Sequence, residues 1–371
     1  MKHSVKLICA LAILCAIFVY LPTQTFAEIS VSADSAVLYL PETDTFLYEK
    51  NADQRMPMAS TTKIMTALVA IENAEMDELI RVPEEAVGTE GSSAYLRGDE
   101  LITLEEMLYA LLLQSANDVA VSLAYHIGGG IDGFAEMMNS RAAEMGLVNT
   151  HFTNPHGLDD RLHYTTAREL AIIAAEALKN ESIRSIVATK RKSFVTEERS
   201  RTYVNHNKLL SLYDDAIGVK TGYTRRCGRC LVGAAERDGL TFISVTLNAP
   251  NDWSDHAKML DLGYDSLEKT TLCEAEDFSF SLPVLDGDAE SVAITNTEAK
   301  SVITKKGEHE IKKYIKLCRY TIAPVKAGDI LGEVIFTMDG EELARVPLVA
   351  RESVNKQKQN GFIKKILSIF N

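Results

Sequence analysis

Cysteine, tryptophan and close groups of metal-binding residues are scarce in this chain of 371 residues. It contains 6 cysteines and 1 tryptophan. Two cysteines lie in the apolar N-terminal run, and the others, Cys227, Cys230, Cys273 and Cys318, are too few to frame a disulfide-built fold. Their spacing lacks the second close pair that a cysteine zinc site needs. We therefore expect no metal and no cofactor.

The one close cysteine pair, Cys227 and Cys230, encloses a glycine and an arginine. In an exported protein such a pair can close as a disulfide. Two reduced, partly buried thiols are the alternative, which we favour, and the spacing leaves both open.

Positive charge is also in short supply. The chain has 39 lysines and arginines against 52 acidic residues, giving a formal charge of -13. An acidic surface repels polyanions, so we exclude nucleic acid as a partner. Hydrophobic residues make up 46% of the chain, which is enough to bury the cores of two domains.

The first 27 residues have the pattern of a secretory signal peptide. Lys2 and Lys6 precede an apolar run over residues 7–20, and Thr25-Phe26-Ala27 resembles a cleavage site. The run is short for a membrane span, although an uncleaved anchor is the alternative. The pattern predicts export to the outer face of the cytoplasmic membrane or the cell wall.

Strand signals occur at both ends of a predicted first domain over residues 28–270. Residues 35–50 carry two apolar segments around a proline-containing turn, which indicates a hairpin. Three more strands are predicted at 216–223, 231–235 and 240–248. Between and after these strands, apolar residues at helical spacing predict helices starting at Leu104 and over 119–127, 134–145, 167–178 and 255–267.

This order predicts an α+β fold. Two early strands, a helical middle and three late strands favour one antiparallel sheet with helices packed on it. From residue 274 to 350 the pattern changes to short alternating segments with Asp-Gly turns, which predicts a small all-β domain. A loop over 151–164 carries three histidines, but no acidic ligand cluster accompanies them, so we expect them to shape the loop.

The strongest chemical signal is Ser60 with Lys63 at the start of an apolar helical pattern. A serine hydroxyl is a weak nucleophile until a base takes its proton, and the spacing puts both side chains on one helical face. The same spacing recurs at Ser266–Lys269 and at Ser353–Lys356, so the pair alone is not specific.

Two later motifs, Ser115-Ala116-Asn117 and Lys220-Thr221-Gly222, together with this pair indicate a serine acyl-transfer site. A cation at Lys220 and partial burial would lower the pKa of Lys63 and make it a base. Ser115 and Asn117 would relay protons and hold the substrate amide. Gly222 would let substrate lie along the strand edge, while the N–H groups of Ser60 and Tyr223 would form an oxyanion hole.

The stretches ASTTKIMTA, FTNPHGLD, HYTTARELA, NHNKLL and GVKTGYT closely resemble D-alanyl-D-alanine carboxypeptidases, the low-molecular-mass penicillin-binding proteins of serine peptidase family S11. The likeness runs from about residue 35 to 267, and APVKAGDILGEV extends it into the second domain. It implies a penicillin-binding-protein/β-lactamase-like domain followed by the β domain.

The resemblance also implies a reaction, the removal of the terminal D-alanine from peptidoglycan stem pentapeptides. Ser60 would carry the acyl group, Lys63 would accept its proton, Ser115 would assist, and Lys220 with Thr221 would bind the substrate carboxylate. β-Lactams would inhibit by acylating the same serine. Many relatives have an arginine leading into the last helix of the domain, where this chain has Asp252 and Trp253. We therefore leave any further carboxylate ligand unassigned.

Residues 355–371 predict a basic amphipathic helix. Its apolar side chains fall on one face and its lysines on the other, which suits an anchor in anionic lipid headgroups, with a frayed tail or a helix packed on the protein as the alternative. Two other functions compete with the carboxypeptidase. A β-lactamase would need a deacylating glutamate motif, which we do not find, and a non-catalytic wall-binding or β-lactam-sensing protein would not need a base beside its serine.

Overall fold

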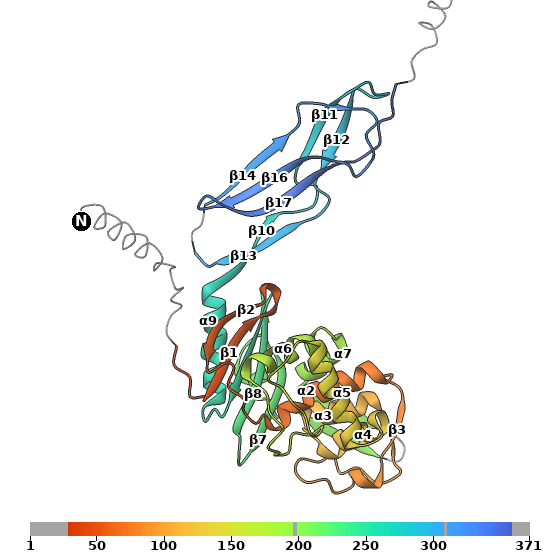
Figure 1. Cartoon of the computed structure of the whole chain (residues 1–371), viewed down its shortest axis with the longest axis vertical. Helices are drawn as coiled ribbons and strands as arrows, with labels where there is room; N and C mark the ends of the chain where they lie inside the picture. Colours follow the sequence, from red (N-terminus) through yellow and green to blue (C-terminus); the bar gives the residue numbers. More distant parts are fainter. Residues whose placement is uncertain (1–28, 196–198, 308–309, 358–371) are drawn as a thin grey trace, which may run out of the picture. The chain divides into compact units, whose positions relative to one another are not determined.

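The computed structural model describes residues 29–195, 199–307 and 310–357 (Figure 1). The predicted signal peptide and all but the first residues of the predicted tail helix lie outside this part of the chain. The described residues form two compact units. The first includes residues up to Arg237 and Thr241–Gly263, and the second Asp238–Leu240 and the residues from Tyr264 on.

A five-stranded sheet in the order β2-β1-β9-β8-β7 is the centre of the first unit. β1 pairs antiparallel with both β2 and β9, and Ser35 lies opposite Leu247. The prediction of one antiparallel sheet assembled from both ends of the domain is therefore confirmed. Its strands are β1 Ser35–Leu40, β2 Thr45–Lys50, β7 Ala216–Thr224, β8 Gly228–Arg237 and β9 Leu240–Leu247.

Helices cover both faces of this sheet (Figure 1). One group lies on one face: α2 Lys63–Asn73, α3 Leu104–Leu113, α4 Asn117–Gly128, α5 Ile131–Glu144, α6 Ala167–Leu178 and α7 Glu181–Ala188. The opposite face is covered by α9 Asp252–Ser266 with the short α8 Leu209–Leu212 beside it, and the Tyr213 hydroxyl just after α8 donates to Asp261 of α9 at 2.9 Å. The ring of His256 on α9 contacts the Ser244 and Thr246 hydroxyls of β9 at 2.7 and 2.9 Å. Burial lowers the pKa of His256 to about 3, so it holds the helix as a neutral ring.

Thr103 caps the start of α3. The Glu106 N–H donates to the Thr103 hydroxyl at 3.3 Å, which satisfies one of the free donors at the helix start. The Glu106 carboxylate is engaged elsewhere: it accepts hydrogen bonds from Arg199 and, at 3.0 Å, from the Tyr203 hydroxyl. Glu106, in the first turn of α3, therefore also binds a neighbouring hairpin.

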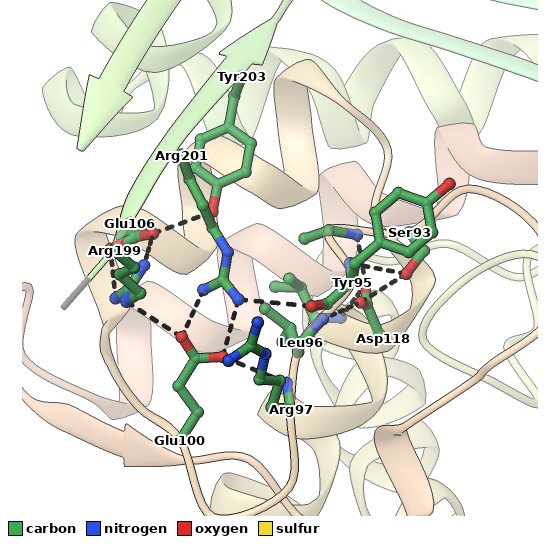
Figure 2. Close-up of polar contacts among 12 residues, drawn as sticks. Ser93, Tyr95, Leu96, Arg97, Glu100, Glu106, Asp118, Arg199, Arg201 and Tyr203 are labelled. Atoms are coloured by element: carbon green, nitrogen blue, oxygen red, sulfur yellow. Dashed lines mark hydrogen bonds and ion pairs between the residues drawn. The ribbon is translucent and has the colours of Figure 1, made fainter. Parts of the chain in front are cut away.

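That hairpin, β5 Arg191–Val195 and β6 Ser200–Val204, was not predicted, and neither was the two-stranded pair β3 Leu79–Arg81 and β4 Leu101–Thr103. Ion pairs join the β5–β6 hairpin to the rest of the unit, beside the packing of Phe194 and Tyr203 on the core. Figure 2 shows Arg199 and Arg201 turned toward two carboxylates, with Arg201 donating to both oxygens of Glu100 at 2.8 Å. The network ties the hairpin to α3 and to the loop that leads into β4.

The second unit is all-β, as the sequence predicted. Its larger sheet has the order β14-β16-β17-β12-β11-β15, and β10 pairs with β13. The strands are β10 Leu267–Cys273, β11 Ser279–Leu285, β12 Ser291–Thr295, β13 Lys300–Lys305, β14 Ile311–Leu317, β15 Thr321–Ile322, β16 Ile330–Met338 and β17 Glu341–Ala350. Within the described ranges, none of the helices has the length and apolar character needed to cross a bilayer.

Candidate active site

Ser60 and Lys63 lie where a 3₁₀ turn, Ala59–Thr62, passes into α2. The Lys63 Nζ is 3.0 Å from the Ser60 Oγ. The turn is held from outside by the 151–164 loop, where the His163 Nε2 contacts the Thr62 hydroxyl at 2.7 Å. Burial lowers the pKa of His163 to about 4, so this histidine acts as a neutral loop-shaping residue. The helix start and the loop together fix the distance between the hydroxyl and the amine.

The Lys63 amine has two further partners, the Asn117 Oδ1 and the His156 carbonyl oxygen, each at 2.6 Å. Carbonyl oxygens only accept, so each of them takes one N–H from the amine. A neutral amine has two N–H groups and one lone pair, and the remaining neighbour, Ser60, carries a hydroxyl that can donate. In its neutral form Lys63 can therefore turn its lone pair toward the Ser60 proton.

The surroundings favour that neutral form. Lys63 is fully buried, and burial lowers its pKa well below the usual value. The positive charge of Lys220 lowers the pKa further, while Asp118 opposes this shift. The Lys220 amine is itself buried, which lowers its pKa to about 7, and it donates to the Thr221 carbonyl oxygen at 2.9 Å.

Ser115 has an unusual conformation and an unused hydroxyl. It lies between α3 and α4 with a φ of 65°, a backbone region that residues other than glycine rarely adopt. The side chain is buried, and its Oγ has no hydrogen-bond partner within the described part of the chain. A buried hydroxyl without a partner costs free energy unless something else, such as a substrate, completes its bonding.

Asn117 begins α4 and has both ends of its side-chain amide engaged. Its Oδ1 accepts from Lys63, and its Nδ2 donates to the Glu90 carbonyl oxygen at 2.6 Å. Its main-chain N–H donates to the Ser92 carbonyl oxygen at 2.7 Å. In this structure Asn117 orients the lysine amine, and the sequence-based assignment as a substrate ligand stays a prediction.

Gly222 on β7 lies against the turn that carries Ser60. A Cβ at position 222 would be 3.1 Å from the Ser60 nitrogen and equally close to the Met58 carbonyl oxygen. That is tighter than almost all real contacts, so the close approach of strand and turn itself favours glycine. The sequence offered a different reason, room for substrate along the strand.

A cavity of about 360 Å³ opens over these residues. Its walls include five of the predicted site residues, namely Ser60, Ser115, Thr221, Gly222 and Tyr223. Lys63, Asn117 and Lys220 are buried behind these walls. The structure thus brings three distant segments of the chain to one cavity.

Sequence reasoning missed two contributors. The His156 carbonyl that binds Lys63 is a main-chain group, which no side-chain pattern marks. Asp118 follows Asn117 but points the other way. It accepts from the Ser93 hydroxyl at 2.7 Å and from the Ala94 and Leu96 N–H groups at 3.0 Å (Figure 2). Asp118 therefore holds the loop whose Ser92 carbonyl positions Asn117.

A protein-family model described as D-alanyl-D-alanine carboxypeptidase matches residues 22–251, more than half of the chain. The chain belongs to this family. A second model, the C-terminal domain of penicillin-binding protein 5, matches residues 267–356 of the carboxypeptidase. The serine acyl-enzyme mechanism is general to the family, so the resemblance stated from the sequence is confirmed.

Curated relatives of the carboxypeptidase carry the same family name. The D-alanyl-D-alanine carboxypeptidase DacF of Bacillus subtilis is 35% identical and aligns over 92% of this chain and 90% of its own length. The Escherichia coli protein DacC is 29% identical, over 94% of this chain and 92% of its own length. Among solved structures, penicillin-binding protein 5 of Haemophilus influenzae has a TM-score of 0.66 at 28% identity. The match covers 90% of this chain and 100% of the Haemophilus influenzae chain.

The four cysteines of the described carboxypeptidase are free thiols. Cys227 lies in the turn between β7 and β8, Cys230 lies on β8, and both are buried free thiols, as the favoured interpretation of the pair expected. The Cys230 thiol and the Thr224 hydroxyl lower the pKa of Cys227 to about 7. Cys230 also lines the cavity that contains Ser60.

Proposed function

We propose that this carboxypeptidase removes the terminal D-alanine from peptidoglycan stem pentapeptides through an acyl-enzyme on Ser60. The observation that carries the proposal is the bonding of Lys63. Two carbonyl oxygens at 2.6 Å occupy its N–H groups, and the Ser60 hydroxyl lies at 3.0 Å in the remaining direction. A buried, uncharged amine in that position is a general base.

In the first step the Ser60 Oγ attacks the carbonyl carbon between the two D-alanines, and its proton passes to Lys63. The N–H groups of Ser60 and Tyr223 stabilise the oxyanion of the tetrahedral intermediate. The C–N bond then breaks. The leaving amine takes a proton from Lys63 through the Ser115 hydroxyl, whose unused bonding capacity supports this relay. Free D-alanine departs, and the shortened peptide remains as an ester on Ser60.

In the second step water attacks this ester. Lys63 takes a proton from the water, the ester C–O bond breaks, and Ser60 recovers its hydroxyl proton. The products are the shortened peptide acid and the free enzyme. β7 is the last strand of its sheet, so the substrate can lie along its edge as an added strand, with the Thr221 hydroxyl toward the terminal carboxylate and the buried Lys220 adding positive charge behind it.

The test is an incubation of the purified protein with a pentapeptide that ends in D-Ala-D-Ala. We expect one free D-alanine for each peptide consumed. Penicillin should block this release and add its mass to the tryptic peptide 56–63, which contains Ser60. Absence of free D-alanine would favour the wall-binding or β-lactam-sensing alternative. A label on another peptide would contradict the assignment of Ser60.

The same incubation separates the carboxypeptidase from the β-lactamase alternative. The carboxylate that raises the pKa of Lys63, Asp118, is buried, accepts hydrogen bonds from the 93–96 loop and is not part of the cavity wall. With no assigned carboxylate to activate water against the penicilloyl ester, we expect the label to persist and penicillin to be consumed in about one equivalent per enzyme. Rapid, repeated penicillin hydrolysis would favour the β-lactamase.

The domain organisation is part of the proposal. Residues 1–27 would direct export, 28–270 would form the catalytic domain, 274–350 the β domain, and 355–371 an amphipathic anchor on the membrane surface. One family model matches residues 22–251 and the other matches residues 267–356. These two matches support a catalytic domain followed by a separate β domain.

Deletion of residues 361–371 tests the anchor. These residues contain five large apolar side chains and two lysines, and their removal takes away the surface that would enter the headgroup region. We expect the shortened protein to move from the membrane fraction to the soluble fraction while it releases D-alanine at an unchanged rate. Unchanged sedimentation with membranes would rule the anchor out.

A further inference from the structure

Arg229 is fixed beside the cavity by a residue from a different element. On β8, it pairs with Tyr223 of β7. Its Nε donates to one Asp252 oxygen at 3.0 Å and its Nη2 to the other at 2.9 Å. The guanidinium carbon lies 5.6 Å from the centre of the Trp253 ring. Asp252 and Trp253, at the start of α9, therefore hold the guanidinium in one plane.

The held guanidinium still has donors to spare. A guanidinium has five N–H groups, and the two bonds to Asp252 use only two of them. The Asp252 side chain is 5% exposed, whereas that of Arg229 is 45% exposed. The buried carboxylate thus orients the arginine, and the exposed part of the arginine lines the cavity that contains Ser60 and Thr221.

The substrate of a carboxypeptidase ends in a free carboxylate, which needs a cation in the cleft. Lys63 and Lys220 are buried, and the Lys220 amine donates to a carbonyl oxygen of its own strand. His206 lines the cavity too, but burial and Lys220 lower its pKa, which favours the neutral ring. Two exposed cations remain among the described cavity residues, Lys208 and Arg229.

Of these two, Arg229 fits the task better. Lys208 is an exposed ammonium on a long side chain with many rotamers, and within the described residues no hydrogen bond or ion pair orients its charge. Arg229 is always charged, planar and already oriented, and the planar fork of its N–H groups matches the two oxygens of a carboxylate. Because Asp252 already restricts the conformations of the Arg229 side chain, less conformational entropy is lost when a substrate binds.

We propose that Arg229, held by Asp252 and Trp253, binds the terminal carboxylate of the peptide together with the Thr221 hydroxyl. This inference rests on the proposed function and names one more part of its substrate site. Arg229 then determines specificity for peptides with a free carboxyl end, and Asp252 is the positioning residue that keeps its guanidinium at the cavity.

The test compares two peptides, one ending in D-Ala-D-Ala and the other in the corresponding carboxamide. For Arg229→Gln we expect KM for the acid to rise roughly 10- to 100-fold, because a charge-assisted hydrogen bond is lost, with kcat within a few-fold. Cleavage of the carboxamide should hardly change, so the preference for the acid should fall by the same factor. Arg229→Lys should restore part of the preference, and Asp252→Asn should lose part of it.

Arg225→Gln is the matched control, because it removes the same charge from an exposed position in the turn just before β8. Its preference for the acid should equal that of the unmodified protein. An unchanged preference in Arg229→Gln, or loss of the preference in Lys208→Gln instead, would overturn the inference. If the unmodified protein released no D-alanine from either peptide, the proposed function itself would fail, which is a different result from an active enzyme with an unchanged preference.

Discussion

Replacement of Lys63 with methionine is expected to reduce D-alanine release and penicillin acylation by about 10³-fold or more, to the level of Ser60→Ala. Methionine has nearly the length of lysine but no amine, so the Ser60 hydroxyl would keep its place and lose its base. Rates of penicillin labelling, followed by mass, measure this step directly. Near-ultraviolet circular dichroism of each variant shows whether the tertiary fold is kept.

The role of Lys63 as base also predicts the direction in which the acylation rate changes with pH. Lys63 accepts a proton only when neutral, and burial with the charge of Lys220 lowers its pKa well below the usual value. The rate of acylation should therefore rise with pH, tenfold per unit below the pKa of Lys63, and level off before the pH reaches the pKa of an ordinary lysine. A Lys63→Met enzyme that kept this rising limb, or lost less than tenfold in rate, would contradict the assignment of Lys63 as base.

The second large effect is expected for Glu106→Ala. The Glu106 side chain is 4% exposed and accepts from Arg199 at 2.8 Å and from the Tyr203 hydroxyl at 3.0 Å (Figure 2). Its removal takes a buried partner from the Tyr203 hydroxyl and one of two carboxylates from Arg199, which keeps its ion pair with Glu100. We expect the free energy of unfolding to fall by about 3 kcal/mol. Tm should fall by roughly 10 °C.

Glu105→Ala is the control for this change. Glu105 is the preceding residue on the same helix turn, but its side chain is 44% exposed and its ion pair with Lys192 is long, at 3.9 Å. Exposed pairs of this kind contribute less than about 1 kcal/mol. Thermal unfolding followed by calorimetry compares the two variants. Equal losses in both would show that the network does not stabilise the fold.

The parts of the site that depend on neighbouring residues could be predicted from the sequence. Ser60 and Lys63 lie one turn apart in any helical conformation, so their contact follows from local geometry. Gly222 lies two residues after Lys220 on one predicted strand, so the distance between them also follows from local geometry. The convergence of the three motifs was inferred from resemblance, and the cavity walls agree with it.

What could not be predicted depends on main-chain groups or on distant pairings. The carbonyl oxygen of His156 binds Lys63, yet every residue type has such an oxygen. Arg229 contacts Asp252 because β8 and α9 pack together. From the sequence alone, an arginine next to other basic residues is expected to be an exposed charge. The β5–β6 hairpin lacks a clear apolar alternation because ion pairs such as Arg201 with Glu100 hold it in place.

The position of β1 within its sheet has a consequence for biogenesis. β1 lies between β2 and β9, so the N-terminal hairpin joins β8 and β7 only through β9. A growing polypeptide therefore completes both Ser60 and Lys220 before it contains the strand that links their surroundings, and closing so long a loop is slow. Until Leu240–Leu247 has emerged and paired, β1 and β2 are not joined to β8 and β7 in one sheet. We therefore expect a chain truncated before Leu240 not to be acylated by penicillin, although it contains Ser60, Lys63 and Lys220.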